Sequence, residues 1–267
     1  MPYLQETFMK KYILLSALYT SLLFSATAEQ VEHYISVSTA EEELLALESQ
    51  FSAMQNSFSR DANASENKTY DMQMLSVRFK DYLQKHLSED EMTEVLENYK
   101  NVVLLQFVSA ASEAQNHDAN ETYSYVENLK RTPEANERIE LVEKISNKLY
   151  SKEAMMVLFD ELMKPLIQNG IGGQNMNDET LKLIKKDYLK QMTESSKNET
   201  LFASKDFTME ELEALLKIAK TSSVEHETKA VFGAMAYSLK EFFMSMASRY
   251  DVSKHQPSST DDTNHSK

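Results

Sequence analysis

Residues 87–107 read LSEDEMTEVLENYKNVVLLQF and contain the pattern that decides the fold class. Ser88 stands three residues before Glu91, which is the capping-box signature of a helix start, and Leu87 and Met92 occupy the two positions of a hydrophobic staple. Apolar side chains then recur three or four positions apart, as on one face of an α-helix. These side chains are Met92, Val95, Leu96, Tyr99, Val103 and Phe107. The stretch therefore predicts an amphipathic helix that begins at Ser88.

The same helical period recurs through most of the 267 residues, and the composition agrees with it. The chain contains four glycines and four prolines, far below the roughly 7% and 5% of an average protein. Turns of β-sheets draw on these two residues. Apolar residues make up 42% of the chain, enough to form a core. The sequence predicts an all-α protein, a bundle of about eight helices with no substantial sheet.

The tetrapeptide KDYL occurs twice, at residues 80–83 and 186–189, and each copy precedes a capped helix start. The second start, FTMEELEALL, has Thr208 and Glu211 in the capping-box positions and a staple of Phe207 with Leu212. The order of tetrapeptide, cap and staple is the same in both copies. This order predicts two duplicated halves.

The predicted organisation follows from this repeat. The first helical repeat is expected over residues 29–118 and the second over residues 133–250, with a connector at 119–132. Thr132-Pro133 reads as an N-cap followed by proline at the first helical position. The polar segment 251–267 is expected to be disordered.

The segment from Lys186 to about Ser222, with Tyr188-Leu189 and Phe207-Thr208 followed by Glu210-Glu211-Leu212, resembles a bacterial family known as domain of unknown function 2059. Members of that family are small, exported and helical. The resemblance implies an exported helical protein, in two copies if the first KDYL segment is counted. It implies no catalytic residues.

Residues 1–28 have the organisation of a signal peptide, with a basic start at Met9-Lys10-Lys11, an apolar stretch from Tyr12 to Phe24 and Ala26-Thr27-Ala28 as an A-x-A cleavage site. Met1 and Met9 are both possible start codons. Thirteen apolar-stretch residues span roughly 20 Å as a helix, which is shorter than the hydrocarbon core of a membrane. The sequence predicts a periplasmic or secreted protein, cleaved near Ala28 and without stable membrane insertion.

The net charge of −14 makes nucleic acid an unfavourable partner, because a negative surface repels phosphate backbones. The absence of cysteine excludes disulfides and cysteine-ligated metals. No two of the six histidines are spaced for a zinc site on one helix, and no phosphate-binding loop or nucleophile motif occurs. Runs of carboxylates stand in first helical turns, where they offset the helix dipole. No cofactor, metal or catalytic residue is predicted.

Methionine and tyrosine are abundant, and both residue types suit an adaptable binding surface. A partner or ligand groove between the halves is predicted at Tyr82, Tyr99, Tyr188, Met155, Met156 and Met192. The predicted function is that of an exported, non-enzymatic helical protein that binds a protein partner or an apolar ligand. Two alternatives stay open: an immunity-type inhibitor of a toxic enzyme in the periplasm, and an enzyme with a dispersed site.

Overall fold

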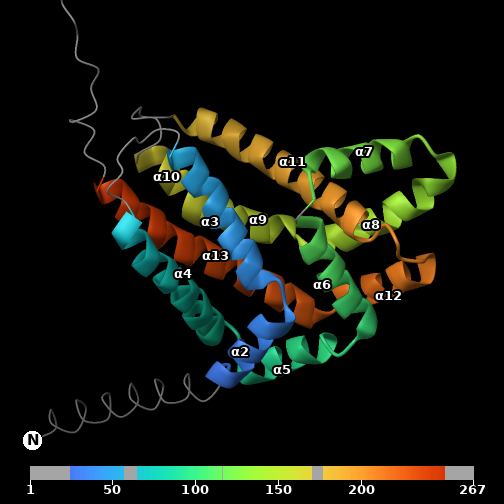
Figure 1. Ribbon diagram of the computed structural model, residues 1–267, viewed down its shortest axis with the longest axis horizontal. Coiled ribbons are helices and arrows are strands. Elements are labelled where there is room, and N and C mark those ends of the chain that lie inside the picture. Colours follow the sequence, from blue (N-terminus) through green and yellow to red (C-terminus); the bar gives the residue numbers. More distant parts are fainter. Residues whose placement is uncertain (1–24, 57–64, 116, 170–176, 250–267) are drawn as a thin grey trace, which may run out of the picture.

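The computed structural model describes residues 25–56, 65–115, 117–169 and 177–249, and within these ranges the fold is a helical bundle (Figure 1). The described part of the chain contains no strand, only an isolated antiparallel bridge between Ser25 and Ser88. The prediction of an all-α bundle is confirmed. The signal-peptide stretch up to residue 24 and the tail from residue 251 lie outside the described residues.

The described helices number eleven when α9, a π-helical segment η3 (Phe159–Met163) and α10 are taken as one continuous helix, against about eight predicted. A short 3-10 turn, η2 (Pro133–Ala135), precedes α8. The helices are α2 (Ala28–Val37), α3 (Ala40–Asn56), α4 (Ser65–His86), α5 (Glu89–Asn98), α6 (Val102–Gln115), α7 (Ala119–Lys130), α8 (Asn136–Leu149), α9 (Lys152–Leu158), α10 (Lys164–Asn169), α11 (Asp178–Ala203), α12 (Met209–Ala219) and α13 (Ser222–Arg249).

Two breaks account for much of the difference in number. The expected helix from Ser88 to Phe107 ends at Asn98, and Asn101 accepts a hydrogen bond on its side-chain Oδ1 from the backbone N–H of Val103. Asparagine side chains compete with the helical backbone in this way. The apolar period also predicts one helix from Glu29 to about Phe58. The structure divides its described part at Ser38, whose backbone is extended and whose Oγ accepts a hydrogen bond from Ala40 N–H. Both interruptions depend on local side-chain bonds that an apolar period does not reveal.

Helix α11 differs from its prediction in length. The apolar period predicts a short helix from about Asp178 to Met192, whereas the helix runs 26 residues to Ala203. Thr193 and Thr200 donate their hydroxyl hydrogen bonds to the carbonyl oxygens four residues earlier, at Leu189 and Ser196. Such bonds allow hydroxyl residues to lie inside a helix. KDYL therefore lies in the middle of α11 but near the end of α4.

The helix of residues 152–169 contains Pro165 without ending there. A proline removes one backbone donor and its ring clashes with the carbonyl four residues earlier. The π-helical segment η3 lies immediately before α10, and Lys164 N–H donates to Phe159 O. The wider turn accommodates the proline within a continuous helix.

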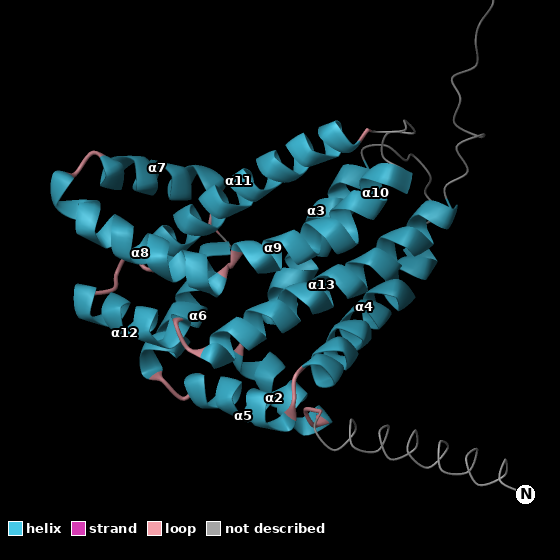
Figure 2. Ribbon diagram, turned by 180° about the vertical axis from the view of Figure 1, so that it is seen from behind, coloured by secondary structure: helices cyan, strands magenta, loops and turns pink. Residues whose placement is uncertain are grey.

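The core has two clusters of buried side chains. Figure 2 shows the arrangement of the helices that contribute them. The first cluster surrounds α13 and joins it to α2, α4, α5 and α9, with Phe79, Leu83 and Phe242 among its most buried residues. The second cluster is formed by α6, α7, α8, α11 and α12. Helix α13, from the second predicted half, packs along α4, from the first. The two predicted halves thus do not each enclose a core of their own, and their duplication stays a prediction.

Residues 25–28 are packed into the fold. The backbone N–H of Ala26 donates to Leu87 O over 2.8 Å, and the side chain of Ala26 is buried. Thr27 is the N-cap of α2 and forms a capping box with Gln30. Cleavage after Ala28, as the A-x-A pattern predicts, would remove all of these contacts. Within the described residues, no helix combines the length and the apolar character that crossing a membrane requires.

Candidate functional site

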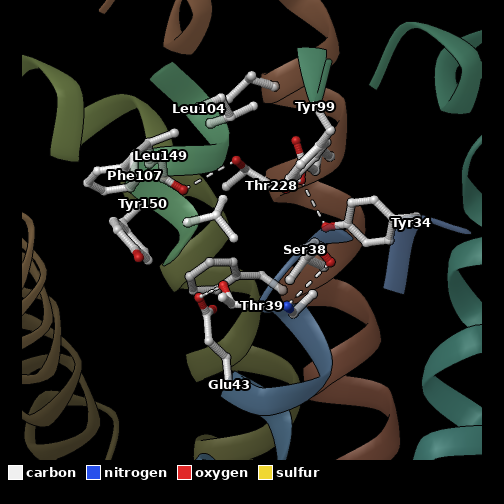
Figure 3. A pocket seen from close by; sticks show the side chains of 16 residues that line it. Tyr34, Ser38, Thr39, Glu43, Tyr99, Leu104, Phe107, Leu149, Tyr150 and Thr228 are labelled. Atoms are coloured by element: carbon white, nitrogen blue, oxygen red, sulfur yellow. Dashed lines mark hydrogen bonds between the residues drawn. The ribbon is translucent and has the colours of Figure 1, made fainter. Parts of the chain in front are cut away.

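A cavity of about 100 Å³ lies where the two core clusters meet, between α2, α3, α6, α8 and α13 (Figure 3). One part of its wall is apolar and includes Leu104, Phe107, Val108, Leu149, Val231 and Phe232. The other part is polar and consists of tyrosine, glutamate, serine and threonine side chains. A mostly apolar hollow with a few convergent polar groups is the usual form of a small-ligand site.

Glu227, on α13, is the central polar residue of this cavity. The hydroxyls of Tyr34 and Tyr99 both donate to its Oε1, over 2.9 Å and 2.5 Å. The two tyrosine rings meet edge to face, with their centroids 5.8 Å apart. Burial raises the pKa of Glu227 to about 7, and the two tyrosine hydrogen bonds oppose that rise. Among the described residues, no hydrogen bond reaches Oε2 of this carboxyl.

Glu43, in the first turn of α3, is the second carboxyl that lines the cavity. The hydroxyl of Thr39 donates to Glu43 Oε1 over 3.0 Å. The pKa of Glu43 is raised to about 7, chiefly by burial; the Thr39 hydrogen bond opposes the rise, and the negative charges of Glu199 and Glu227 add to it. The cavity therefore contains two carboxyls whose pKa is raised to about 7.

Three tyrosines, Tyr34, Tyr99 and Tyr150, line the cavity beside the carboxyls (Figure 3). Burial, followed by the charge of the nearby glutamates, raises the pKa of each phenol well above its ordinary value. The three phenols therefore stay protonated at any physiological pH, and those of Tyr34 and Tyr99 donate hydrogen bonds to Glu227. Thr228 donates to Leu149 O over 3.3 Å and closes the wall between α13 and α8.

The arrangement can bind a group that donates hydrogen bonds to carboxylates, and it can transfer a proton near pH 7. Within the described ranges, no three histidine, aspartate or glutamate side chains gather as a metal site would require.

The six residues predicted to form a groove do not lie in one place. Tyr99 lines the cavity. Tyr82, on α4, stacks on His86 with ring centroids 3.8 Å apart and covers Gly233 of α13. A Cβ at position 233 would come within 2.6 Å of the Tyr82 hydroxyl, so a larger residue there would force the Tyr82 ring to move. Tyr82 thus has a packing role.

The other four predicted residues lie on α9 and α11. Met155 is buried in the first core cluster, and Met192 packs against that cluster from α11. The ring centroid of Tyr188 lies 5.3 Å from that of Phe159. Met156 alone of the six lines the surface groove between α9 and α11.

This second hollow, the lysine groove, has a volume of about 570 Å³. It is lined by Lys152, Met156, Lys182, Lys185, Lys186, Leu189, Lys190, Thr193 and Glu194. Because five of its nine residues are lysines, its charge is opposite to that of the chain as a whole, −14.

Sequence reasoning missed Glu43 and Glu227. The Glu41–Glu43 run was explained by the helix dipole, but the three carboxyls have different partners. Glu41 and Glu42 accept hydrogen bonds from Ser76 and Ser112, while Glu43 lines the cavity. Glu227 had a detectable signal, because it stands at helical spacing between the apolar residues Val224 and Val231. A carboxyl within an apolar stripe indicates a buried polar contact.

Comparison of the chain with protein-family models, with curated proteins and with solved structures finds no match. The geometry of the cavity and of the lysine groove therefore carries the functional argument.

Proposed function

We propose that this is an exported, non-enzymatic binding protein whose cavity holds a small ligand with a protonated amine. The observation that carries the proposal is the placement of Glu227 and Glu43 in one small cavity whose wall otherwise consists of an apolar part and of tyrosine, serine and threonine side chains. An ammonium group has three donors and no acceptor. It would pair with the two carboxyls, and its hydrocarbon part would contact side chains such as Leu104 and Val231.

The size of the cavity limits the ligand. A dry cavity of roughly 150 Å³ accepts a benzene-sized molecule, and this cavity measures about 100 Å³. A compact alkylamine fits these dimensions better than a peptide or an amino sugar. Simple amines resemble lysine, whose amino group has a pKa of about 10.4, and are therefore cationic at neutral pH.

Two sequence features support the export part of the proposal. Residues 1–28 follow the signal-peptide pattern, and residues 186–222 resemble an exported helical family. The periplasm, or the medium outside the cell, is the proposed location. N-terminal sequencing of protein recovered from the periplasmic fraction tests it, and recovery of uncleaved chain from washed membranes would contradict it.

The ligand proposal is tested by thermal unfolding with a series of primary alkylamines from methylamine to hexylamine at pH 7.5. The midpoint should rise with amine concentration, most for an intermediate chain length, because binding to the folded state stabilises it. Alcohols of equal length should give no comparable rise, since they lack the charge. Equal shifts with amines and alcohols, or none with either, would contradict the proposal.

Glu227→Gln keeps an oxygen for the two tyrosine hydroxyls but removes the negative charge. This variant should lose the amine effect. Glu225→Gln is the matched control, because Glu225 lies on the same helix but is exposed and pairs with Lys229 over 2.6 Å. The control should respond to amines as the unaltered chain does.

Proton linkage provides an independent readout. Carboxyls with a pKa of about 7 are partly protonated at pH 7, and an ammonium ligand favours their ionised form. Amine binding should therefore release protons, up to about one per site. Calorimetric titration in two buffers with different ionisation enthalpies measures that number. A value of zero would indicate that the amine binds elsewhere.

One observation also favours an enzyme as a second candidate function. A general acid or base works best with a pKa near the working pH, and burial raises the pKa of both Glu43 and Glu227 to about 7. A broad hydrolase screen of the unaltered chain beside Glu43→Gln and Glu227→Gln tests this candidate. Activity that both variants lose would replace the binding proposal with a catalytic one.

A further inference from the structure

The lysine groove concentrates positive charge on one side of α11. Lys182, Lys186 and Lys190 follow one another at intervals of four residues and therefore lie along one face of this helix. Lys152, at the start of α9, stands on the other side of the groove. In a chain with a net charge of −14, the surface outside the groove is more negative still.

Most of the lysines that line this groove form no ion pair within the described part of the chain. Lys185 pairs with Asp160 over 2.6 Å and lies over the ring of Phe159. Within the described residues, the other four lysines of the groove form no ion pair with a carboxylate. One carboxylate, that of Glu194, also lines the groove, and the balance of charge among its lining residues remains positive. Four like charges on one surface repel one another, so a structural role does not explain them.

The groove also has apolar contact surface. Met156 from α9 and Leu189 from α11 line it between the lysines. Methionine adapts to differently shaped partners. A free phosphate or another small anion would use the lysines but would have no use for these side chains.

We propose that the lysine groove is a docking site for an acidic, amphipathic segment of a partner protein. Carboxylates of the segment meet the four unpaired lysines, and its apolar side chains contact Met156 and Leu189. Complementary charge accelerates and orients such an encounter. An anionic membrane is a poorer fit, because a flat lipid surface does not enter a groove and the acidic remainder of the protein is repelled by it.

The probe is a fluorescent peptide of about five helical turns, built from glutamate and leucine with the leucines on one face. Two comparison peptides replace leucine with serine, or glutamate with lysine. Fluorescence anisotropy with the full chain at low salt should show binding of the glutamate–leucine peptide alone. The affinity should fall steeply as salt is added, because the attraction between exposed charges is screened.

The decisive variant is Lys182→Glu, Lys186→Glu and Lys190→Glu together, and binding should weaken by about tenfold or more. The matched control is Lys144→Glu, Lys148→Glu and Lys217→Glu, which changes the net charge equally at exposed positions outside the groove. The control should bind within about twofold of the unaltered chain. Met156→Ala with Leu189→Ala should weaken binding severalfold.

Three results would overturn the proposal. Equal weakening by the groove and control variants would show general charge attraction without a site. Binding to phosphatidylglycerol vesicles that depends on the three lysines, without binding of the peptide, would assign the groove to a lipid surface. Concentration-dependent self-association in sedimentation experiments that the groove variant abolishes would make a second copy of this chain the occupant.

Discussion

The turns before α5 and before α12 contain the same local device in different surroundings. In the α5 corner (residues 87–91), Ser88 N–H donates to Glu91 Oε2 over 2.8 Å, and Glu91 N–H donates to Ser88 Oγ over 3.2 Å. In the α12 corner (residues 207–211), the corresponding bonds of Thr208 and Glu211 measure 2.7 Å and 3.2 Å. Both predicted capping boxes are confirmed. The cap chemistry is therefore local and independent of the surroundings.

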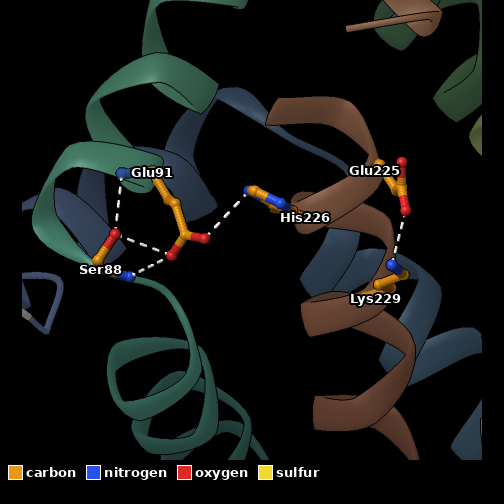
Figure 4. Close-up of polar contacts among 5 residues, drawn as sticks. All are labelled: Ser88, Glu91, Glu225, His226 and Lys229. Atoms are coloured by element: carbon orange, nitrogen blue, oxygen red, sulfur yellow. Dashed lines mark hydrogen bonds and ion pairs between the residues drawn. The ribbon is translucent and has the colours of Figure 1, made fainter. Parts of the chain in front are cut away.

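The two corners are supported differently. The α5 corner receives the Ala26–Leu87 backbone bond and a hydrogen bond from the Gln30 side chain to Glu89 O over 3.1 Å. His226 of α13 lies with its Nδ1 3.0 Å from Glu91 Oε1, an ion pair when the imidazole is protonated (Figure 4). At the α12 corner, Arg138 of α8 donates to the carbonyl oxygens of Ser204, Lys205 and Phe207. The α5 corner is therefore stabilised by contacts from several other elements, whereas the α12 corner is stabilised by the guanidinium of Arg138.

The largest expected difference between the corners concerns their staple residues. Leu87 is 2% exposed within the first core cluster, while Phe207 is partly exposed at the edge of the second. Leu87→Asp should destabilise the protein by roughly 4 kcal/mol or more, because it buries an unpaired charge. Phe207→Asp should cost about half of that, since its carboxylate can reach water. Urea unfolding curves measure both, and equal losses would show that the corners are equally buried.

Of the two corners, only the α5 corner should be affected by removal of residues 25–28. A chain that begins at Glu29 lacks the buried Ala26, its bond to Leu87 O and the Thr27 cap of α2. Compared with a chain that begins at Ser25, we expect a loss of about 2–3 kcal/mol from the cap, one hydrogen bond and the buried methyl group. Thermal unfolding measures the difference. Identical midpoints would mean that cleavage after Ala28 leaves the fold intact.

Arg138→Met is the corresponding test of the α12 corner. Hydrogen bonds from a charged group contribute roughly 1.5–3 kcal/mol, and partial exposure places the expected loss near the lower end, about 1–2 kcal/mol. Arg131→Met is the control, because Arg131 is exposed and its side chain has no part in the α12 corner. Combining Arg138→Met with Thr208→Ala should give a loss that differs from the sum, since both act on one turn. If the two losses of unfolding free energy simply add, Arg138 and the Thr208 cap stabilise the turn independently of each other.

The caps themselves should contribute less. Ser88→Ala and Thr208→Ala should each cost about 0.5–2 kcal/mol, with the larger loss at Ser88 because its surroundings exclude more water. The two losses should add, because the corners share no partner. Ser195→Ala, an exposed position inside α11, should be neutral or slightly stabilising. If Ser88→Ala leaves the free energy of unfolding in urea unchanged, that cap does not stabilise the fold.

The smallest expected effects at the two corners are those of pH. The bonds from Ser88 and Thr208 lower the pKa of Glu91 and Glu211 below the usual 4.5. Their contribution to stability is present above pH 4.5 and is lost as the pH falls through the lowered pKa of the folded state. Glu91→Gln and Glu211→Gln should therefore flatten the acid limb of the stability curve. If the acid limb of the curve of stability against pH has the same slope in both variants, other carboxyls cause the acid unfolding.

Glu43 and Glu227 should change the stability with pH in the opposite direction. Their pKa is raised to about 7 in the fold, so stability falls as the pH rises from about 4.5 to about 7 and changes no further above that. Glu227→Gln should remove part of this decline, while Glu225→Gln should not. Urea unfolding between pH 5 and pH 8 separates this neutral limb from the acid limb of the corners.

The sequence by itself determined the helical class and the two caps, because both depend on residues within a few positions of each other. A capping box joins positions three apart, and an apolar period repeats every turn. The helical spacing of apolar residues did not predict the breaks at Ser38 and Asn101, because these breaks depend on single side-chain bonds to the backbone.

Only the tertiary structure decided the cavity and the core. The bonds of Glu227 to Tyr34 and Tyr99 join residues 193 and 128 positions apart. Which carboxyl is buried depends on which helices pack together, and here α13 packs against α4 across the predicted boundary of the halves. Burial then raises the pKa of Glu43, whose neighbours Glu41 and Glu42 belong to the same acidic run and bind serine hydroxyls instead. Neighbours in sequence acquire different chemistry because desolvation depends on packing.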